Sequence, residues 1–460
     1  MSASTNRREF LKTGAALGVG FWIASREAGA QTTAPTTSPS QQLNFACVGV
    51  AGKGDGDSNH VATLGNIAAI CDVNDKNLDK KGHAYPSARK FNDFREMFDK
   101  MGDKIDAVTV SIPDHCHAVV AMTAIKAGKH VYCQKPMTHT LAEARALQEA
   151  ARQYQVVTQM GNQGTAGDEF RRGVEILRAQ MLGPVKEVHV WTNRPIWPQA
   201  PDIMARPTDT PPVPPNLHWD LFLGPAPERP YNSAYQPFNW RGWWDFGTGA
   251  LGDMGCHTVN LPFMGLRLEH PTSVLGRAGD LNPETYPSWA KIEFEFPARD
   301  EMPPVKLVWW EGHKDRAKTK RNIPGHDVTH GFDLPESGSL MIGENGMMMS
   351  ISDYGDGQRL IFNSDSTGFS GPPPETLPRL HQSDLDQAQK NEWVAAIQGR
   401  GTPMSHFDYA GLLTETILLG NVAIREAQTK LEWDAANMKF PNHPDAEKWL
   451  SYDYRTGYSL

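Results

Sequence analysis

The sequence predicts an α/β protein in which a doubly wound parallel sheet precedes a second domain with an open, mostly antiparallel sheet. In the first part of the chain, short apolar segments alternate with helical ones, which is typical of βαβ units. Strands are expected at 45–50, 67–71, 108–112, 130–133 and 156–160. Helices are expected at 117–127 and, from a Thr140-x-x-Glu143 capping box, to about 154. The first domain is therefore expected to cover 43–164.

Beyond Gly164 the expected strands follow one another without intervening helices, which favours an antiparallel sheet in an α+β domain. These strands are expected at 186–192, 272–278, 290–296, 305–310, 339–342 and 347–351, with closing helices at 384–398 and 409–427. The second domain is expected over 165–435, with a C-terminal extension over 436–460. Twelve prolines within 195–237 exclude a helix or a central strand there and predict an ordered excursion.

The composition excludes several classes of protein. With 39% hydrophobic and 21% charged residues in 460, the chain is neither collagen-like nor disordered nor a polytopic membrane protein. Its net charge of -8 offers no basic footprint for nucleic acid. The five cysteines form no C-x-x-C pair and predict neither a zinc site nor a disulfide framework. His115 and His117 flank Cys116, but no second cluster supplies further ligands, so no metal is expected.

The first thirty residues have the order of an export signal. Arg7-Arg8 is followed by an uncharged run over 13–25 and by a small-x-small cleavage site at 28–30. The run is shorter than the roughly 20 apolar residues that span a bilayer. The segment resembles a twin-arginine (Tat) signal peptide, so we expect an exported, periplasmic protein that engages the Tat machinery. Residues 31–42, rich in Ser, Thr and Pro, are expected to form a disordered tether.

A glycine-rich turn after the first expected strand indicates dinucleotide binding by a Rossmann-type domain. Gly52-Lys53-Gly54 stands where backbone N–H groups can approach a pyrophosphate, although Asp57 replaces the third glycine of G-x-G-x-x-G. A tight turn without a ligand would have the same glycines. Asp72, twenty residues after Gly52, ends the next strand, where a carboxylate accepts hydrogen bonds from ribose hydroxyls and repels a 2′-phosphate. We therefore expect NAD rather than NADP.

Residues 111–117 (SIPDHCH), 130–136 (HVYCQKP), 159–163 (QMGNQ) and the pair Asp253-x-x-x-His257 resemble the Gfo/Idh/MocA oxidoreductases. The resemblance covers almost the whole chain after residue 43 and is weakest over 195–237. It implies a Rossmann domain joined to an open-sheet domain, an NAD(P)-dependent oxidoreductase acting on sugars or cyclitols, and a homo-oligomer formed through the open sheet.

The resemblance also implies roles for individual residues. Lys135 corresponds to the lysine of the family's E-K-P motif at the catalytic centre. The nicotinamide half of the cofactor site is implied to be lined by Pro113, His117, Gln134 and Asn162. Gln134 departs from the family pattern, which usually has glutamate, and so removes a negative partner near Lys135.

The residue types themselves are compatible with these roles. Asp253 and His257, four residues apart, share a face if they lie in a helix, where a carboxylate can orient a histidine that takes an alcohol proton. A surface pair would have the same spacing. Trp240, Arg241 and Trp244 precede this segment, and aromatic rings with an arginine can bind a sugar. An aromatic cluster between domains is the equal alternative.

The leading hypothesis is therefore an exported oxidoreductase that moves a hydride between a sugar-like secondary alcohol and a tightly held NAD. His257 would take the hydroxyl proton, Lys135 would polarise the oxygen and Asp253 would orient His257. One alternative is a redox-neutral, NAD-requiring glycosidase or lyase that works through a transient keto-sugar. Another is a sugar-binding protein without catalytic activity.

Overall fold

The computed structural model describes residues 42–363 and 371–460. The expected signal peptide, and the expected tether up to residue 41, lie outside the described residues. Within the described ranges, no helix is both long enough and apolar enough to cross a membrane.

The first sheet has six parallel strands in the order β3-β2-β1-β4-β5-β6. The strands are β1 Leu43–Val48, β2 Gly65–Cys71, β3 Arg89–Phe91, β4 Ala107–Val110, β5 His130–Gln134 and β6 Thr158–Gly161. The connecting helices are α2 Lys53–Ala62, α3 Asp75–Ala84, α4 Phe94–Met101, α5 Asp114–Lys126 and α6 Leu141–Tyr154. The strand order reverses between β1 and β4, and ligands bind at such a switch point beyond the carboxyl ends of the strands.

The second sheet has eight strands in the order β13-β12-β11-β7-β10-β9-β8-β14, and only the β7–β10 pair is parallel. Its strands are β7 Val185–Trp191, β8 Ser273–Gly279, β9 Trp289–Phe296, β10 Val305–Gly312, β11 Gly338–Gly343, β12 Gly346–Ser350, β13 Arg359–Phe362 and β14 Lys430–Glu432. The predicted fold class, a parallel doubly wound sheet followed by an open and mostly antiparallel one, is confirmed.

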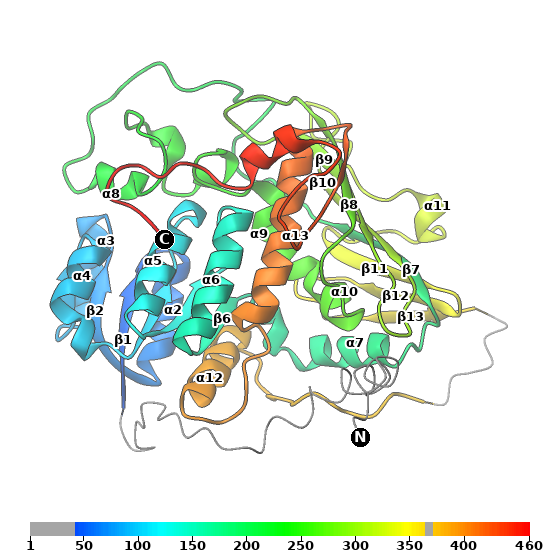
Figure 1. Cartoon of the computed structure of the whole chain (residues 1–460), viewed down its shortest axis with the longest axis horizontal. Helices are drawn as coiled ribbons and strands as arrows, with labels where there is room; N and C mark the ends of the chain where they lie inside the picture. The colour runs from blue at the N-terminus through cyan, green and yellow to red at the C-terminus, as the bar shows by residue number, and fades with distance from the viewer. Residues whose placement is uncertain (1–41, 364–370) are drawn as a thin grey trace, which may run out of the picture. The chain divides into compact units, whose positions relative to one another are not determined.

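The remaining helices are α7 Asp168–Arg178, α8 Trp219–Leu223, α9 Gly249–Thr258, α10 Asn260–Gly265, α11 His326–Thr329, α12 Leu385–Ile397 and α13 Phe407–Arg425. In Figure 1, α13 (orange) runs beside α6 and α9, and it contacts both helices and β8. One apolar core continues through these elements from the first sheet to the second. The two sheets therefore share one hydrophobic core, to which α9 contributes.

Helix α12 was expected in the second domain, yet it packs on the first sheet. It contacts α2 and β6, and Figure 1 places it (light orange) below the first sheet's helices. The Trp393 ring lies 6.0 Å from that of Phe45 on β1 and 5.7 Å from that of Tyr132 on β5. All three side chains are fully buried, so α12 completes the hydrophobic core of the first sheet.

The proline-rich excursion has its own apolar cluster, which includes α8 and the aromatic residues that follow the excursion. Its two ends lie together, because the rings of Trp197 and Phe238 are 6.1 Å apart. A Cβ on Gly242 would stand 2.6 Å from the Pro198 carbonyl oxygen, so only glycine permits this approach. The excursion thus brings Arg194, three residues after the end of β7, to the segment that precedes α9.

Candidate active site

A cavity of about 820 Å³ extends from the carboxyl ends of β1 and β4 to α9. Residues that follow the first sheet's strands form one part of its lining: Gly49, Gly52, Lys53, Asp72, Ser111, Pro113, Asp114, Gln134 and Lys135. The other part comes from residues beyond the first sheet and includes Arg194, Ile196, Phe238, Trp240, Arg241, Asp253, His257 and Tyr354. The cavity therefore joins the predicted cofactor and catalytic residues.

The loop before α2 has the shape that a dinucleotide requires. Gly49 and Gly52 have φ angles of 81° and 54°, which favour glycine. A Cβ on Gly49 would lie 2.2 Å from the Ser111 carbonyl oxygen, and one on Gly54 would lie 2.1 Å from the Gly49 carbonyl oxygen. Gly54 is thus required for packing, whereas Gly52 faces open space at the N-cap of α2. The open helix N-terminus fits a pyrophosphate.

Asp72 lies where the ribose of a dinucleotide would be held. Its Oδ2 accepts a hydrogen bond from the Val50 N–H (3.1 Å), and its Oδ1 accepts from the Asn74 N–H (2.9 Å) and Asn77 Nδ2 (3.1 Å). Burial raises the pKa of Asp72, while these donors oppose that rise. The carboxylate, which lines the cavity, is therefore fixed by the glycine loop, by the loop that follows β2 and by α3.

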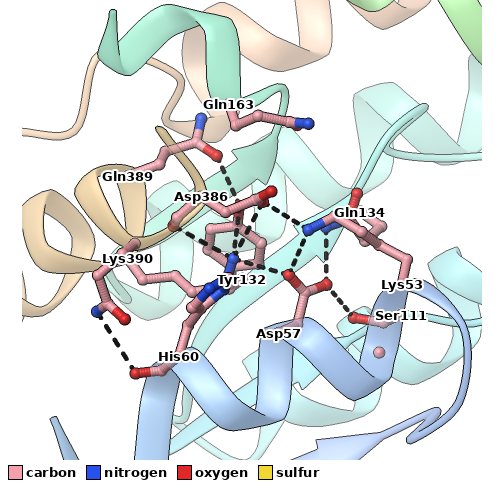
Figure 2. A network of polar contacts seen from close by, with 12 residues as sticks. Lys53, Asp57, His60, Ser111, Tyr132, Gln134, Gln163, Asp386, Gln389 and Lys390 are labelled. Atoms are coloured by element: carbon pink, nitrogen blue, oxygen red, sulfur yellow. Dashed lines mark hydrogen bonds and ion pairs between the residues drawn. The ribbon is translucent and has the colours of Figure 1, made fainter. Parts of the chain in front are cut away.

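Asp57, at the position of the missing third glycine, is the centre of a buried polar network (Figure 2). Its Oδ1 lies 2.7 Å from Lys390 Nζ and 2.8 Å from Lys53 Nζ. Its Oδ2 accepts hydrogen bonds from Ser111 Oγ (2.7 Å) and Gln134 Nε2 (2.8 Å). Burial would raise the pKa of Asp57, but the two ammonium groups lower it to about 2.

This network fixes Lys53 and joins α12 to the cofactor loop. Lys53 Nζ also lies 2.5 Å from Asp386 Oδ1 on α12, so two carboxylates hold this ammonium group. Asp57, His60 and Asp386 are close enough to share a metal ion. Lys53 and Lys390, however, contact the same two carboxylates, and their ammonium groups supply the positive charge.

Two residues expected to line the nicotinamide half lie behind the lining instead. The His117 ring nitrogens contact the carbonyl oxygens of Pro136 (2.7 Å) and Ile112 (2.8 Å), and burial lowers the pKa of His117 to about 4. Asn162 is fully buried, and its Nδ2 donates to the Cys256 carbonyl oxygen (3.3 Å). Both side chains support the cavity wall from within the core.

Lys135 and Asp253 form the charged centre of the cavity. Lys135 Nζ lies 2.5 Å from the Asp253 carbonyl oxygen and 2.9 Å from Asp253 Oδ1. Arg241 Nε and Arg194 Nε stand 3.4 Å and 3.6 Å from the same carboxylate. Burial would raise the pKa of Asp253, but Lys135 and the two guanidinium groups lower it to about 2. Asp253 is therefore ionised, and it orients Lys135.

His257 lies one helical turn from Asp253 and also lines the cavity. It is 5% exposed, its Nδ1 has no hydrogen-bond partner among the described residues, and its ring lies 5.0 Å from that of Tyr354. Burial, together with the Lys135 charge, lowers the pKa of His257 well below 6.5. We expected Asp253 to orient His257. In the structure the Asp253 carboxylate contacts Lys135, Arg194 and Arg241 instead. The low pKa leaves His257 neutral at physiological pH.

In the aromatic segment before α9, some side chains face the cavity and others lie in the hydrophobic core. Trp240 and Arg241 line the cavity, as expected. Trp244 was expected to bind substrate, but its ring packs 3.7 Å from that of Tyr286 and 3.8 Å from the Arg425 guanidinium carbon. Its Nε1 donates to the Asn282 carbonyl oxygen (3.3 Å). Trp244 is 5% exposed and belongs to the core because the tight turn before α9 directs it inward.

Two family models match the chain. One describes the NAD-binding Rossmann fold of an oxidoreductase family and covers residues 43–162, and the other describes that family's C-terminal alpha/beta domain and covers residues 204–304. Both matched parts of the chain are similar to the Gfo/Idh/MocA oxidoreductase family.

Individual relatives match over shorter stretches. A glycosyl hydrolase family 109 protein of Solibacter usitatus is 31% identical over 151 residues, 30% of this chain and 34% of that protein. An inositol 2-dehydrogenase of Salmonella typhimurium is 29% identical over 113 residues, 22% of this chain and 32% of that protein. The chain thus matches about a third of the length of these curated relatives.

Solved structures share the fold over more of the chain. The aldose-aldose oxidoreductase of Caulobacter crescentus, complexed with glycerol, has a TM-score of 0.57 at 19% identity and covers 85% of this chain and 100% of its own. Levoglucosan dehydrogenase, complexed with NADH and L-sorbose, has a TM-score of 0.56 at 16% identity, with coverages of 85% and 99%. At these identities the likeness extends to the fold alone.

Three further residues of the site were not predicted from the sequence. Arg194, a counter-ion of Asp253, lies between β7 and Pro195. In the sequence, that position indicates the end of a strand and gives no sign of a functional site. Asp114 lies at the first turn of α5 and accepts hydrogen bonds from Thr248 N–H (3.1 Å) and Oγ1 (2.6 Å). Burial raises the pKa of Asp114 to about 7. Lys390 lies four residues after Asp386, on the same face of an expected helix. This i,i+4 pair is the feature of the sequence that could have drawn attention to Lys390.

The Asp72 geometry predicts a preference for NAD over NADP. A 2′-phosphate would bring a second negative charge to a carboxylate that Val50 and Asn74 hold in place. We expect Asp72→Ala to narrow the ratio of NAD to NADP affinity, as measured by titration of tryptophan fluorescence with each nucleotide. Asp79→Ala, an exposed carboxylate on α3, is the control. Equal affinities for both nucleotides in the wild type would refute the prediction.

Proposed function

We propose that this protein is an exported oxidoreductase that uses a tightly held NAD to oxidise or reduce a secondary alcohol of a sugar or cyclitol. The observation that carries the proposal is the convergence of Lys135, Asp253 and His257 in the same cavity as the glycine loop and Asp72. Inositol and levoglucosan dehydrogenases among the relatives and structural neighbours support this class of substrate.

The proposed role of each residue follows from its contacts. Gly52, the N-terminus of α2 and Asp72 would hold the dinucleotide, which when bound supplies the acceptor for a hydride from carbon. Lys135 Nζ, oriented by Asp253, donates a hydrogen bond to the reacting oxygen and favours its partial negative charge. His257, which is neutral, takes the hydroxyl proton on a ring nitrogen. Burial excludes water from this proton transfer.

The proposed export explains why the cofactor would be held tightly. Arg7-Arg8 and the small residues at 28–30 have the pattern of a Tat signal, and the Tat machinery carries folded proteins with their cofactors bound. Outside the cytoplasm, an enzyme that released its nicotinamide after each turnover would run out of it. The open sheet is the proposed contact of a homo-oligomer.

We expect the protein recovered from the periplasm to contain close to one NAD per chain and to complete many turnovers without added nucleotide. Bound nucleotide is measured after acid extraction, and turnover is followed by product analysis with a sugar donor and a sugar acceptor present. A variant with Arg7 and Arg8 both replaced by lysine, which should stay in the cytoplasm, is the localisation control. Nucleotide-free protein that reacts only with excess NAD would refute tight retention, and cleavage of a glycoside without a keto product would favour a redox-neutral glycosidase.

A further inference from the structure

We infer that the substrate of this site is an anionic sugar, a sugar acid whose carboxylate binds between Arg194 and Arg241. This inference rests on the proposed function, because it specifies which sugars enter the cavity beside Lys135. The observations behind it are an excess of positive charge, two guanidinium groups with unused donors, and an apolar wall beside them.

The part of the cavity around Asp253 has more positive than negative charge. Lys135, Arg194 and Arg241 all act on Asp253 and lower its pKa. Asp114 is the other carboxyl group within the influence of Lys135 and Arg241, and its pKa of about 7 means that it is only partly ionised at neutral pH. Three cations therefore face one full and one partial negative charge, and an anionic ligand would balance them.

Other acidic residues of the lining face different partners. Asp72 and Asp93 belong to the ends of β2 and β3, on the side of the glycine loop. The charge of Asp353 affects the pKa of Tyr354, as do the charges of Asp386 and Lys53 in the network around Asp57. The excess of positive charge is thus confined to the part of the cavity around Lys135.

The two arginines are held in place but not satisfied. Their Nε atoms lie 3.4 Å and 3.6 Å from the Asp253 carboxylate, whereas a strong charge-assisted hydrogen bond is about 2.7–2.9 Å long. The guanidinium carbon of Arg241 lies 4.5 Å from the centre of the Phe238 ring and 4.3 Å from the centre of the Trp240 ring. Arg194 Nη1 contacts Asn193 Oδ1, and Arg241 Nη1 donates to the Phe238 carbonyl oxygen (3.2 Å), whereas the Nη2 atoms of both arginines lack a hydrogen-bond partner within residues 42–363 and 371–460. A planar, fixed guanidinium group with free donors matches a carboxylate.

The wall next to these arginines suits a sugar ring. Ile196 and Phe238 line the cavity and are 61% and 41% exposed, which is unusual for large apolar side chains. They lie at the two ends of the proline-rich excursion, Ile196 two residues after Arg194 and Phe238 three residues before Arg241. A ring that packs its C–H face on them would place a carboxylate at the arginines and a hydroxyl toward Lys135.

The test compares matched pairs of sugars on the full, NAD-loaded protein. Glucose and galactose are compared with glucuronate and galacturonate, with the methyl esters of these acids, and with the corresponding 6-phosphates. Oxidation is followed as reduced nicotinamide at 340 nm in a single turnover. We expect kcat/KM to be about 10- to 100-fold higher for an acid than for its neutral parent and its methyl ester, the range for charged hydrogen bonds.

Variants then assign the effect to the two arginines. Arg241→Gln and Arg194→Gln should each lower the ratio of acid to neutral kcat/KM about tenfold, and Arg241→Lys should retain an intermediate ratio. Arg277→Gln, which removes an exposed arginine paired with Glu293 on the second sheet, should leave the ratio unchanged. The comparison of sugars on the wild type stands even where a variant fails to fold.

The possible outcomes distinguish failure of this inference from failure of the proposed function. Equal kcat/KM for acids and neutral sugars would overturn the inference and leave the proposed function standing. A preference for the 6-phosphates over the uronates would overturn the assignment of a carboxylate. Failure of every sugar to reduce the bound nicotinamide would overturn the proposed function itself.

Discussion

Replacing Lys135 or His257 by alanine is expected to lower kcat by about 10²–10⁴-fold, the scale of a lost general acid or base. Lys135 Nζ is the donor that Asp253 holds at 2.9 Å in the cavity, and His257 is a buried base with an unpartnered Nδ1. Single-turnover reduction of bound nicotinamide by a sugar substrate measures the effect. Near-normal kcat in either variant would show that the assigned role is wrong.

Two further measurements identify a catalytic rather than a structural defect. Bound NAD content and the unfolding midpoint should stay close to wild type in both variants, and Lys126→Ala, an exposed lysine at the end of α5, should change neither activity nor stability. Since burial keeps the pKa of His257 well below 6.5, His257 is already neutral across physiological pH. Its protonation should therefore reduce kcat only in acid, so a fall centred near pH 6.5 would contradict this assignment.

Replacing Asp57 by asparagine is expected to lower the free energy of unfolding by about 3–5 kcal/mol, the cost of removing one partner of a buried ion pair. Asp57 and Lys390 are both fully buried, and the substitution keeps the shape of the side chain while removing its charge. Chemical denaturation at neutral pH measures the change. A loss below about 1 kcal/mol would mean that the ion pair adds little.

The pH dependence of this difference follows from the direction of the pKa shift. Folding lowers the pKa of Asp57 from 3.8 to about 2, so its charge stabilises the folded state fully above the ordinary carboxyl range. That contribution is lost as pH falls toward 2. The gap between wild type and Asp57→Asn should therefore shrink below about pH 4. Asp79→Asn, whose carboxylate forms an exposed pair with Lys90, should show no comparable gap.

The sequence predicted those features that depend on local patterns. The capping box is present as expected, with Thr140 Oγ1 accepting from the Glu143 N–H and Glu143 Oε2 accepting from the Thr140 N–H. The expected strands of both sheets were located to within about two residues, because runs of apolar residues mark them. Short strands such as β3 and β14 lack such a run and were missed.

Contacts across the chain could not be predicted in the same way. Asp253 pairs with Arg194 rather than His257, because β7 and the excursion place that guanidinium group beside α9 from 59 positions away. Trp240 and Trp244 look alike in sequence, but only the turn before α9 decides which one faces the cavity. The low pKa of His257 depends on burial, which a four-residue spacing does not reveal.

The placement of α12 on the first sheet determines when this chain can finish folding. A ribosome releases the six strands of that sheet long before residues 385–397 emerge. Until then Phe45 and Tyr132 lack Trp393, and Asp57 lacks Lys390, which is 333 residues away in sequence. Such distant contacts slow folding and leave apolar surface exposed to aggregation. Completion of the cofactor half thus awaits residues 385–397, so a chain exported in the folded state would leave the cytoplasm only after this segment has been synthesised and packed.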